Sequence, residues 1–210
     1  MKKKILFMVS SMNIGGVEKS LLSLLGVIPK DKYDITVLTL DKRGGFLEYI
    51  PEHVKIVEAE WFKEIKPIIM EAPQNTIKIY LKFGKIFKII SFIYSYYKSK
   101  NTGDRYIYYK NILKSIPVNE GYYDVAIAYA GPTEIIDAYI GNKVKAKKKI
   151  AWVHFDISKH KVNFKLYEKL YEKFDKIFVV SQEANKKLNE IIPSTENKSE
   201  VLLNIISKDL

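Results

Sequence analysis

The stretch that decides the fold covers residues 5–28 and reads ILFMVSSMNIGGVEKSLLSLLGVI. Its first five residues are all apolar, which indicates a strand buried on both faces within a parallel sheet. Small polar residues and the pair Gly15-Gly16 then interrupt the apolar run and suit a tight turn. After the glycines, apolar residues recur with helical spacing, and Glu18 in the first turn favours the helix dipole. The stretch therefore predicts a strand, a glycine loop and a helix.

The glycine loop has the properties of an anion-binding site. A helix that begins beside glycines presents free backbone N–H groups and a positive dipole end, and Gly15 and Gly16 would let a ligand approach closely. Many α/β proteins, however, use glycine here only to fit a helix against a strand. Lys19 does not complete a P-loop, and the G-x-G-x-x-G dinucleotide fingerprint is absent. Both of these nucleotide-binding types are therefore disfavoured.

The composition indicates a globular protein without metal. The chain has 210 residues, of which 47% are hydrophobic, enough for one α/β domain with a sizeable core. It has no cysteine, the three histidines lack a zinc-binding spacing, and no two acids form a recognisable catalytic pair. We expect neither a metal nor a cofactor in this chain. No secretory signal is visible, so we expect a cytoplasmic protein.

The charge favours an anionic partner. The formal net charge is +11 and is carried mostly by lysine, which suits nucleic acid, acidic lipid or phosphorylated small molecules. Arg43 and Arg105 are the only arginines, and no nucleic-acid-binding signature is present. We therefore expect no nucleic-acid partner.

Strand and helix patterns alternate along most of the chain. Further strands are predicted at residues 34–40, 54–57, 124–129, 147–153, 175–181 and 200–203, and helices at 46–50, 133–140, 161–173 and 182–192. This order predicts a Rossmann-like α/β fold: a doubly wound, mainly parallel sheet of about seven strands with flanking helices, spanning residues 1–203. Asp41 follows the second strand, where dinucleotide-binding proteins place a ribose-binding acid, but the missing fingerprint argues against that role.

A helical insertion interrupts the alternation at about residues 61–117, and it is rich in lysine and aromatic residues. No acidic residue occurs between Glu71 and Asp104. On a helical wheel one stripe is basic and the opposite side is apolar. The basic stripe comprises Lys78, Lys82, Lys85 and Lys88, and the apolar side comprises Ile79, Phe83, Ile86, Phe87, Ile90, Ile93 and Tyr94.

Two interpretations of this insertion remain open. In the first, the apolar side packs on the sheet and the lysines are solvated. In the second, the lysines and the aromatic residues bind the anionic headgroups of a membrane, which would place the protein peripherally on the inner face of that membrane. These aromatic residues are Phe92, Tyr94, Tyr96 and Tyr97. The lysines recur too often for a membrane-spanning helix.

Polar residues follow three of the predicted strands, at residues 10–16, at residues 154–156 and at Ser181. Ligands of open parallel sheets bind outside the carboxyl ends of the strands, so these segments are expected to converge. His154 can donate a hydrogen bond or carry charge, although a lone histidine at a strand end is more often structural.

Four segments resemble the retaining glycosyltransferases of the GT4 family: SSMNIGGVEKSLLSLL at 10–25, AWVHFD at 151–156, FVVSQEANKKL at 178–188 and VLLNIIS at 201–207. The amino-terminal Rossmann-like domain of that family begins with a strand, a GG-x-E loop and a helix. The resemblance implies the amino-terminal, acceptor-binding half of a GT-B enzyme, with residues 204–210 beginning the interdomain hinge. In the usual hinge, proline, glycine and aspartate stand at the positions of Leu203, Ile205 and Ser207. The carboxyl-terminal domain, with its nucleotide-sugar site and E-x7-E element, is absent from this sequence.

In the intact enzyme the resemblance implies sugar transfer from a nucleotide sugar to a cell-envelope or lipid-linked glycan acceptor, with retained configuration and without metal; this chain alone would be inactive. His154 would be the catalytic-site histidine that hydrogen-bonds the transferred sugar or the acceptor. The other residues expected in the same cleft are Gly15, Gly16, Glu18, Lys19, Asp156 and Ser181. The alternative is a non-catalytic Rossmann-like module that binds an acidic glycan or a membrane lipid.

Overall fold

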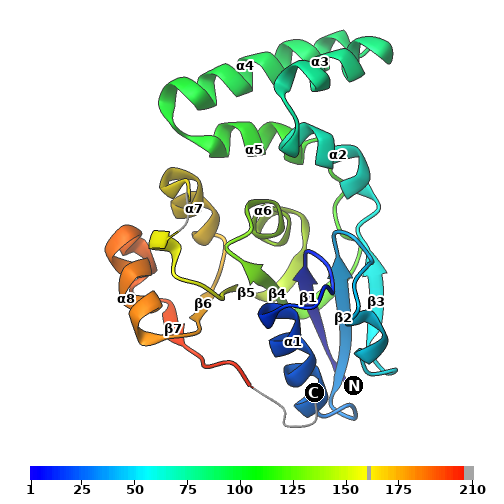
Figure 1. Cartoon of the computed structure of the whole chain (residues 1–210), viewed down its shortest axis with the longest axis vertical. Helices are drawn as coiled ribbons and strands as arrows, with labels where there is room; N and C mark the ends of the chain where they lie inside the picture. The colour runs from blue at the N-terminus through cyan, green and yellow to red at the C-terminus, as the bar shows by residue number, and fades with distance from the viewer. Residues whose placement is uncertain (160–161, 206–210) are drawn as a thin grey trace.

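The computed structural model describes residues 1–159 and 162–205 and contains one seven-stranded sheet (Figure 1). All strand pairs are parallel, in the order β3-β2-β1-β4-β5-β6-β7. The strands are β1 Lys3–Val9, β2 Tyr33–Thr39, β3 Lys55–Glu58, β4 Tyr122–Gly131, β5 Lys145–Val153, β6 Lys176–Val179 and β7 Ser199–Val201. The predicted doubly wound α/β fold is confirmed, with strand boundaries within a few residues of those expected.

Helices flank the sheet. The α-helices are α1 Gly16–Val27, α2 Trp61–Met70, α3 Pro73–Lys82, α4 Ile86–Thr102, α5 Arg105–Leu113, α6 Glu134–Lys143, α7 Phe164–Tyr171 and α8 Gln182–Ile191; the 3-10 helices are η1 Leu47–Tyr49, η2 Ile157–Lys159 and η3 Pro193–Thr195. The helix predicted at 161–173 begins only at Phe164, because the Asn163 side chain caps it by accepting a hydrogen bond from Leu166 N at 3.0 Å. Residue 161 and hinge residues 206–210 lie outside the described residues.

The strands bury both of their faces, as a parallel sheet between two helical layers requires. In β1, Ile5, Phe7 and Val9 pack in the cluster that includes α1. The alternate residues Leu6 and Met8 pack in the other cluster, which includes residues of α2, α5, α6, α7 and α8. The period of two along β1 therefore fixes which helices cover each face.

The strand order reverses at β1. The chain proceeds from β1 outward to β2 and β3, then returns to the opposite side of β1 as β4 and continues outward to β7. Such a reversal opens a crevice at the carboxyl ends of the two strands concerned, because their connections leave in opposite directions. The loops after β1 and β4 border this crevice.

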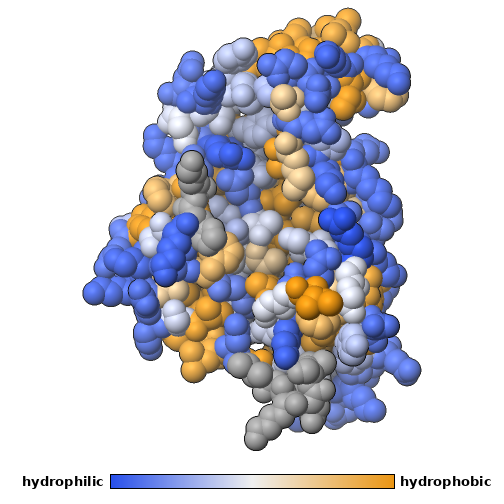
Figure 2. All heavy atoms as spheres, in the orientation of Figure 1, coloured by the Kyte–Doolittle hydropathy of each residue, from blue (hydrophilic) through white to orange (hydrophobic). Residues whose placement is uncertain are grey.

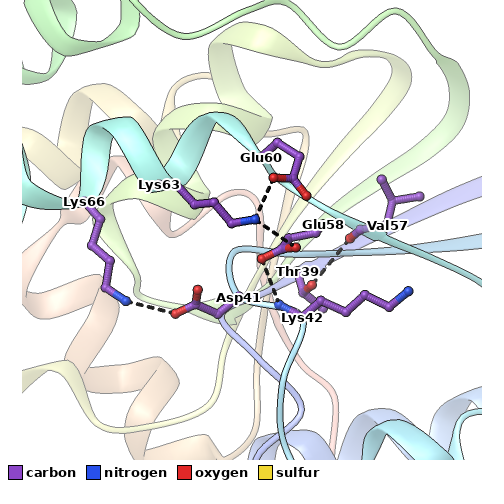
Figure 3. Close-up of polar contacts among 8 residues, drawn as sticks. All are labelled: Thr39, Asp41, Lys42, Val57, Glu58, Glu60, Lys63 and Lys66. Atoms are coloured by element: carbon purple, nitrogen blue, oxygen red, sulfur yellow. Dashed lines mark hydrogen bonds and ion pairs between the residues drawn. The ribbon is translucent and has the colours of Figure 1, made fainter.

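The insertion contains four helices, and it starts from a polar network at the ends of β2 and β3 (Figure 3). Lys66 of α2 forms an ion pair with Asp41 at 3.0 Å. Lys63, one turn earlier, bridges Glu58 at 3.4 Å and Glu60 at 2.6 Å. Asp41 thus has a structural partner in the helix that begins the insertion.

The single basic stripe predicted along the insertion is wrong. Gly84 adopts a left-handed φ of +63° and ends the helical path, so Lys78 and Lys82 belong to α3 whereas Lys88 belongs to α4. Lys85 is the residue that precedes α4. Residues other than glycine rarely adopt this conformation, which explains why the periodic pattern does not continue as one helix across position 84.

The interpretation in which the insertion's apolar side packs on the sheet is also contradicted. All seven residues of that side are exposed, from 37% for Ile93 to 89% for Phe87. The helix α5 lies between α4 and the rest of the molecule (Figure 1). On the other side of α4, Phe92, Ser95 and Ser99 are buried. Sequence periodicity identified the apolar side correctly but could not show that α5 would cover the opposite one.

Candidate functional site

The loop between β1 and α1 is held by a neighbouring loop. Met12 N donates to Arg43 O at 2.9 Å, and Met12 O accepts from Phe46 N at 2.9 Å. Gly44 has a φ of +120°, and a Cβ at this position would overlap the Met12 carbonyl. Glycine at position 44 is therefore required by the fold.

Gly16, in contrast, has no structural requirement for a missing side chain. It is the first residue of α1, its φ is not positive, and a Cβ would meet nothing within 4 Å. The preceding Gly15 is extended, with a φ of −157°, and a Cβ there would meet only the flexible end of Glu18, 2.5 Å from Oε2. No side chain caps α1, so its first backbone N–H groups have no side-chain acceptor from the capping residue.

The first turns of α1 are linked to the histidine at the end of β5. Ser20 Oγ and Tyr129 Oη, at the end of β4, lie 2.8 Å apart in a buried hydrogen bond. The Tyr129 ring centroid lies 4.5 Å from that of His154, and the Trp152 ring stacks on His154 at 5.9 Å with an interplanar angle of 8°. Tyr129 therefore links the first turns of α1 to His154 at the carboxyl ends of adjacent strands.

His154 is uncharged at neutral pH. Burial lowers its pKa to about 4, and the nearby Tyr129 main chain opposes the shift only in part. Neither ring nitrogen makes a well-formed hydrogen bond to a residue that the structure describes. Both nitrogens are withdrawn from solvent, so a ligand reaches them only when the atoms that cover them move. A neutral imidazole can then donate from one nitrogen and accept at the other, and so bind a polar ligand without contributing charge.

Three of the predicted site residues line one small pocket of about 210 Å³: His154, Asp156 and Ser181. The hydroxyl and the N–H of Ser158 donate to the Asp156 carboxylate at 2.7 and 2.9 Å, and these bonds lower the pKa of Asp156. Ser181 has a structural role as the cap of α8, because its Oγ accepts from Ala184 N at 3.1 Å. Lys159 also lines the pocket.

The remaining candidates fall into two groups. Glu18 and Lys19 lie in the first turn of α1, next to Gly15 and Gly16, and the Lys19 side chain is exposed. The lysines proposed to face a membrane lie on the insertion instead, away from the crevice: Lys78, Lys82, Lys85 and Lys88.

Sequence reasoning missed Ser20 and Tyr129. Each lies in a helix or strand pattern that looks purely structural, and they are 109 residues apart. Only the pairing of β4 next to β1 brings them together. No signal in the sequence indicated the hydrogen bond itself.

A second pocket, of about 410 Å³, lies where the insertion meets the segment before α7. There Asn163 Nδ2 donates to Gly103 O at 2.9 Å and Lys165 Nζ to Thr102 O at 2.8 Å. Lys169 forms an ion pair with Asp104. These contacts join the end of α4 to the helix that follows the His154 loop.

Two negative findings concern the described residues alone. Within ranges 1–159 and 162–205, no three acids or histidines cluster closely enough to hold a metal ion. None of the helices in the same ranges is both long and apolar enough to cross a bilayer.

Solved structures of Anabaena HepE (Alr3699) resemble the chain. HepE in complex with UDP covers 97% of this chain at 16% sequence identity, with a TM-score of 0.50, and the chain covers 44% of HepE. HepE in complex with UDP and glucose covers 96% at 15% identity, with a TM-score of 0.49. No protein-family model and no curated protein matches the sequence. The likeness shows the fold alone, a Rossmann-like α/β domain, and the chain spans less than half the length of HepE.

Proposed function

We propose that this chain is the acceptor-binding half of a retaining glycosyltransferase related to the GT4 family. It would work with a second domain that binds the nucleotide sugar, and would transfer the sugar to a cell-envelope or lipid-linked glycan. The proposal is supported by the GT-B half-domain fold, by the GT4-like segments, and by the binding of UDP to HepE.

The arrangement around His154 carries this proposal. A neutral imidazole whose nitrogens make no well-formed hydrogen bond to a described residue lies at the end of β5, linked through Tyr129 and Ser20 to the start of α1, which no side chain caps. Gly16 leaves open space at that helix end for which the fold gives no reason. An anionic diphosphate at the helix start and a sugar hydroxyl at the histidine would match these two features.

Each group would have a defined task. Backbone N–H groups at the start of α1 would stabilise negative charge on the diphosphate as the sugar leaves it. His154 would hydrogen-bond the transferred sugar or the acceptor and so orient it. Because the histidine is neutral, it would not repel the positive charge that develops on the sugar ring in the transition state.

The alternative function is a non-catalytic Rossmann-like module that binds an acidic glycan or a membrane lipid. The observation that favours it is the exposed basic and apolar surface of the insertion. The coding sequence after Leu210 separates the two. An in-frame domain with an E-x7-E element supports the transferase, whereas a stop codon at that position supports the module or a split enzyme.

Transfer assays on the intact protein, with a panel of nucleotide sugars, test the catalytic proposal. His154→Ala should lower the rate about 100-fold, the typical effect of removing one positioned donor. His53→Ala is the matched control, because His53 is exposed near the amino ends of β1 and β2. His154 lies at the opposite ends of the strands. Equal rates for the two variants would contradict the role of His154.

A second pair of variants tests the glycine. Gly16→Leu should lower transfer by filling the open space, while Gly26→Leu, later in the same helix, should not, although a Cβ at either position meets nothing within 4 Å. Thermal unfolding confirms that both variants are folded. If Gly16→Leu transfers sugar normally, the diphosphate does not approach this helix start.

A further inference from the structure

The helix α4 presents its hydrophobic residues to solvent. We define the α4 apolar surface as Phe83, which precedes the helix, together with Ile86, Phe87, Ile90, Ile93, Tyr94 and Tyr97. Their exposed fractions range from 37% to 89%. Figure 2 shows hydrophobic residues gathered at the top of the molecule, over the region where α3 and α4 lie in Figure 1. Single exposed apolar residues are common, but a contiguous set marks an interaction surface.

An ordinary amphipathic helix packs its apolar side against the protein, whereas α4 turns the α4 apolar surface to solvent. Its surface residues are spaced by three and four positions and so lie along one side of the helix. The buried residues Phe92, Ser95 and Ser99 lie along the other side. There Asn111 of α5 bonds Ser95 at 2.8 Å and Ser91 at 3.0 Å. Phe92 also packs on this side, against the rings of Tyr80, Tyr96 and Tyr108. These polar and aromatic contacts fix the helix and leave the α4 apolar surface outward.

Basic side chains border the apolar surface. Lys85 Nζ lies 5.4 Å from the Phe83 ring centroid, and Lys98 Nζ lies 5.2 Å from that of Tyr94. No acidic residue occurs between Glu71 and Asp104. None of the six lysines in this interval forms an ion pair with an acid in the described ranges. The surface thus combines an apolar centre with unpaired positive charge.

We infer that the α4 apolar surface docks on an anionic lipid bilayer, with its isoleucines and phenylalanines in the acyl boundary and the lysines at the headgroups. Charge complementarity selects this occupant, because apolar burial and attraction to anionic headgroups add together at a bilayer surface. Tyr94 and Tyr97 suit the same depth, since tyrosine has an apolar ring and a polar hydroxyl. A second copy of the chain is disfavoured, because it would bring two sets of lysines together.

Docking would also position the crevice. The end of α4 contacts Asn163, which caps α7, and Lys165 in the first turn of α7, the helix that follows the His154 loop. A bilayer bound at α4 would therefore lie on the same side of the protein as the carboxyl ends of the strands. The inference does not rest on the proposed function, since lipid binding is measured without a sugar donor.

Vesicle cosedimentation of the 210-residue chain tests the inference. The chain should bind vesicles of phosphatidylcholine with 30% phosphatidylglycerol, and should bind pure phosphatidylcholine far more weakly. The variant with Lys82, Lys85 and Lys88 each changed to Glu should lose at least roughly 100-fold in apparent affinity, about fivefold for each lysine. Reversal of Lys2, Lys30 and Lys32, exposed near the amino ends of the strands, makes the same change in net charge and should have a much smaller effect.

The apolar half of the inference has its own variants. Phe87→Ser with Ile90→Ser should abolish vesicle binding, while Val27→Ser with Tyr49→Ser, which also alters exposed apolar residues, should not. Circular dichroism checks that all variants are folded. Two results would overturn the inference: equal vesicle binding by the Phe87/Ile90 and Val27/Tyr49 variants, or a dimer in sedimentation velocity that only the Phe87/Ile90 variant loses. The second result would identify a copy of this chain as the occupant.

Discussion

The sheet region buries some polar side chains, whereas the insertion exposes some of its apolar side chains. Around the sheet, Asp137 of α6 is fully buried and both ring nitrogens of His154 are withdrawn from solvent. In the insertion, Phe87 is 89% exposed while serines of the same helix are buried. Both arrangements cost free energy unless something compensates. The two proposals above assign different partners to these regions: a polar ligand at the crevice and an anionic bilayer surface at α4.

The largest predicted difference between the regions is in the free energy of unfolding, when a phenylalanine of each region is replaced by alanine. Phe7 of β1 is 1% exposed and packs edge-on against Tyr129 at 5.8 Å. Phe7→Ala should lower the free energy of unfolding by about 3–5 kcal/mol, because it leaves a cavity. Phe87→Ala should change it by less than about 0.5 kcal/mol. Urea unfolding measures both, and a large loss from Phe87→Ala would mean that α4 is covered by part of the protein itself.

The next effect is the pH dependence of the free energy of unfolding that the buried Asp137 causes. Burial raises the pKa of Asp137 to about 7, although Thr133 N donates to its carboxylate at 3.0 Å. The unfolded chain has a value near 3.9. Between about pH 4 and pH 7 the folded state therefore binds more protons, and this acid destabilises the fold increasingly as the pH rises.

The titration of His154 changes the free energy of unfolding with pH in the opposite direction. Its folded pKa of about 4 lies below the unfolded value near 6.5, so its contribution to stability is present above pH 6.5 and is lost as the pH falls toward 4. Asp137→Asn keeps the acceptor for Thr133 and removes only the acid's contribution. The free energy of unfolding of this variant should rise more steeply between pH 4.5 and 6.5 than that of the unaltered chain. Parallel pH profiles from urea titrations would show that Asp137 is not buried as a titrating acid.

The smallest predicted effect concerns an ion pair that joins the two regions. Arg105 of α5 pairs with Glu134 of α6 at 2.7 Å, and both side chains remain partly exposed. Arg105→Gln should cost about 0.2–1 kcal/mol, since solvent screens such a pair. The difference should shrink in 1 M salt. A loss of several kcal/mol that salt does not reduce would show a tighter junction between the regions than this exposure indicates.

Much of the fold could be predicted from the sequence because the strands follow simple patterns. The apolar run of β1 and the regular alternation of strand and helix required a parallel sheet with helices on both faces. The glycine loop and His154 could be placed at carboxyl ends of strands for the same reason. Tyr129 and Ser20 could not be predicted as partners, because their contact depends on which strand lies beside β1.

For the insertion, the sequence by itself determined that one side of its helices is apolar and that lysines accompany it without acids. Tertiary structure decided what each side contacts: Gly84 divides the pattern into two helices, and α5 takes the serine side of α4. The physical reason is that helical periodicity records which residues share a side, whereas burial depends on the neighbours that packing supplies. The same limit applies to the crevice, where the sequence supplied Gly16 and His154 and the strand order brought them together.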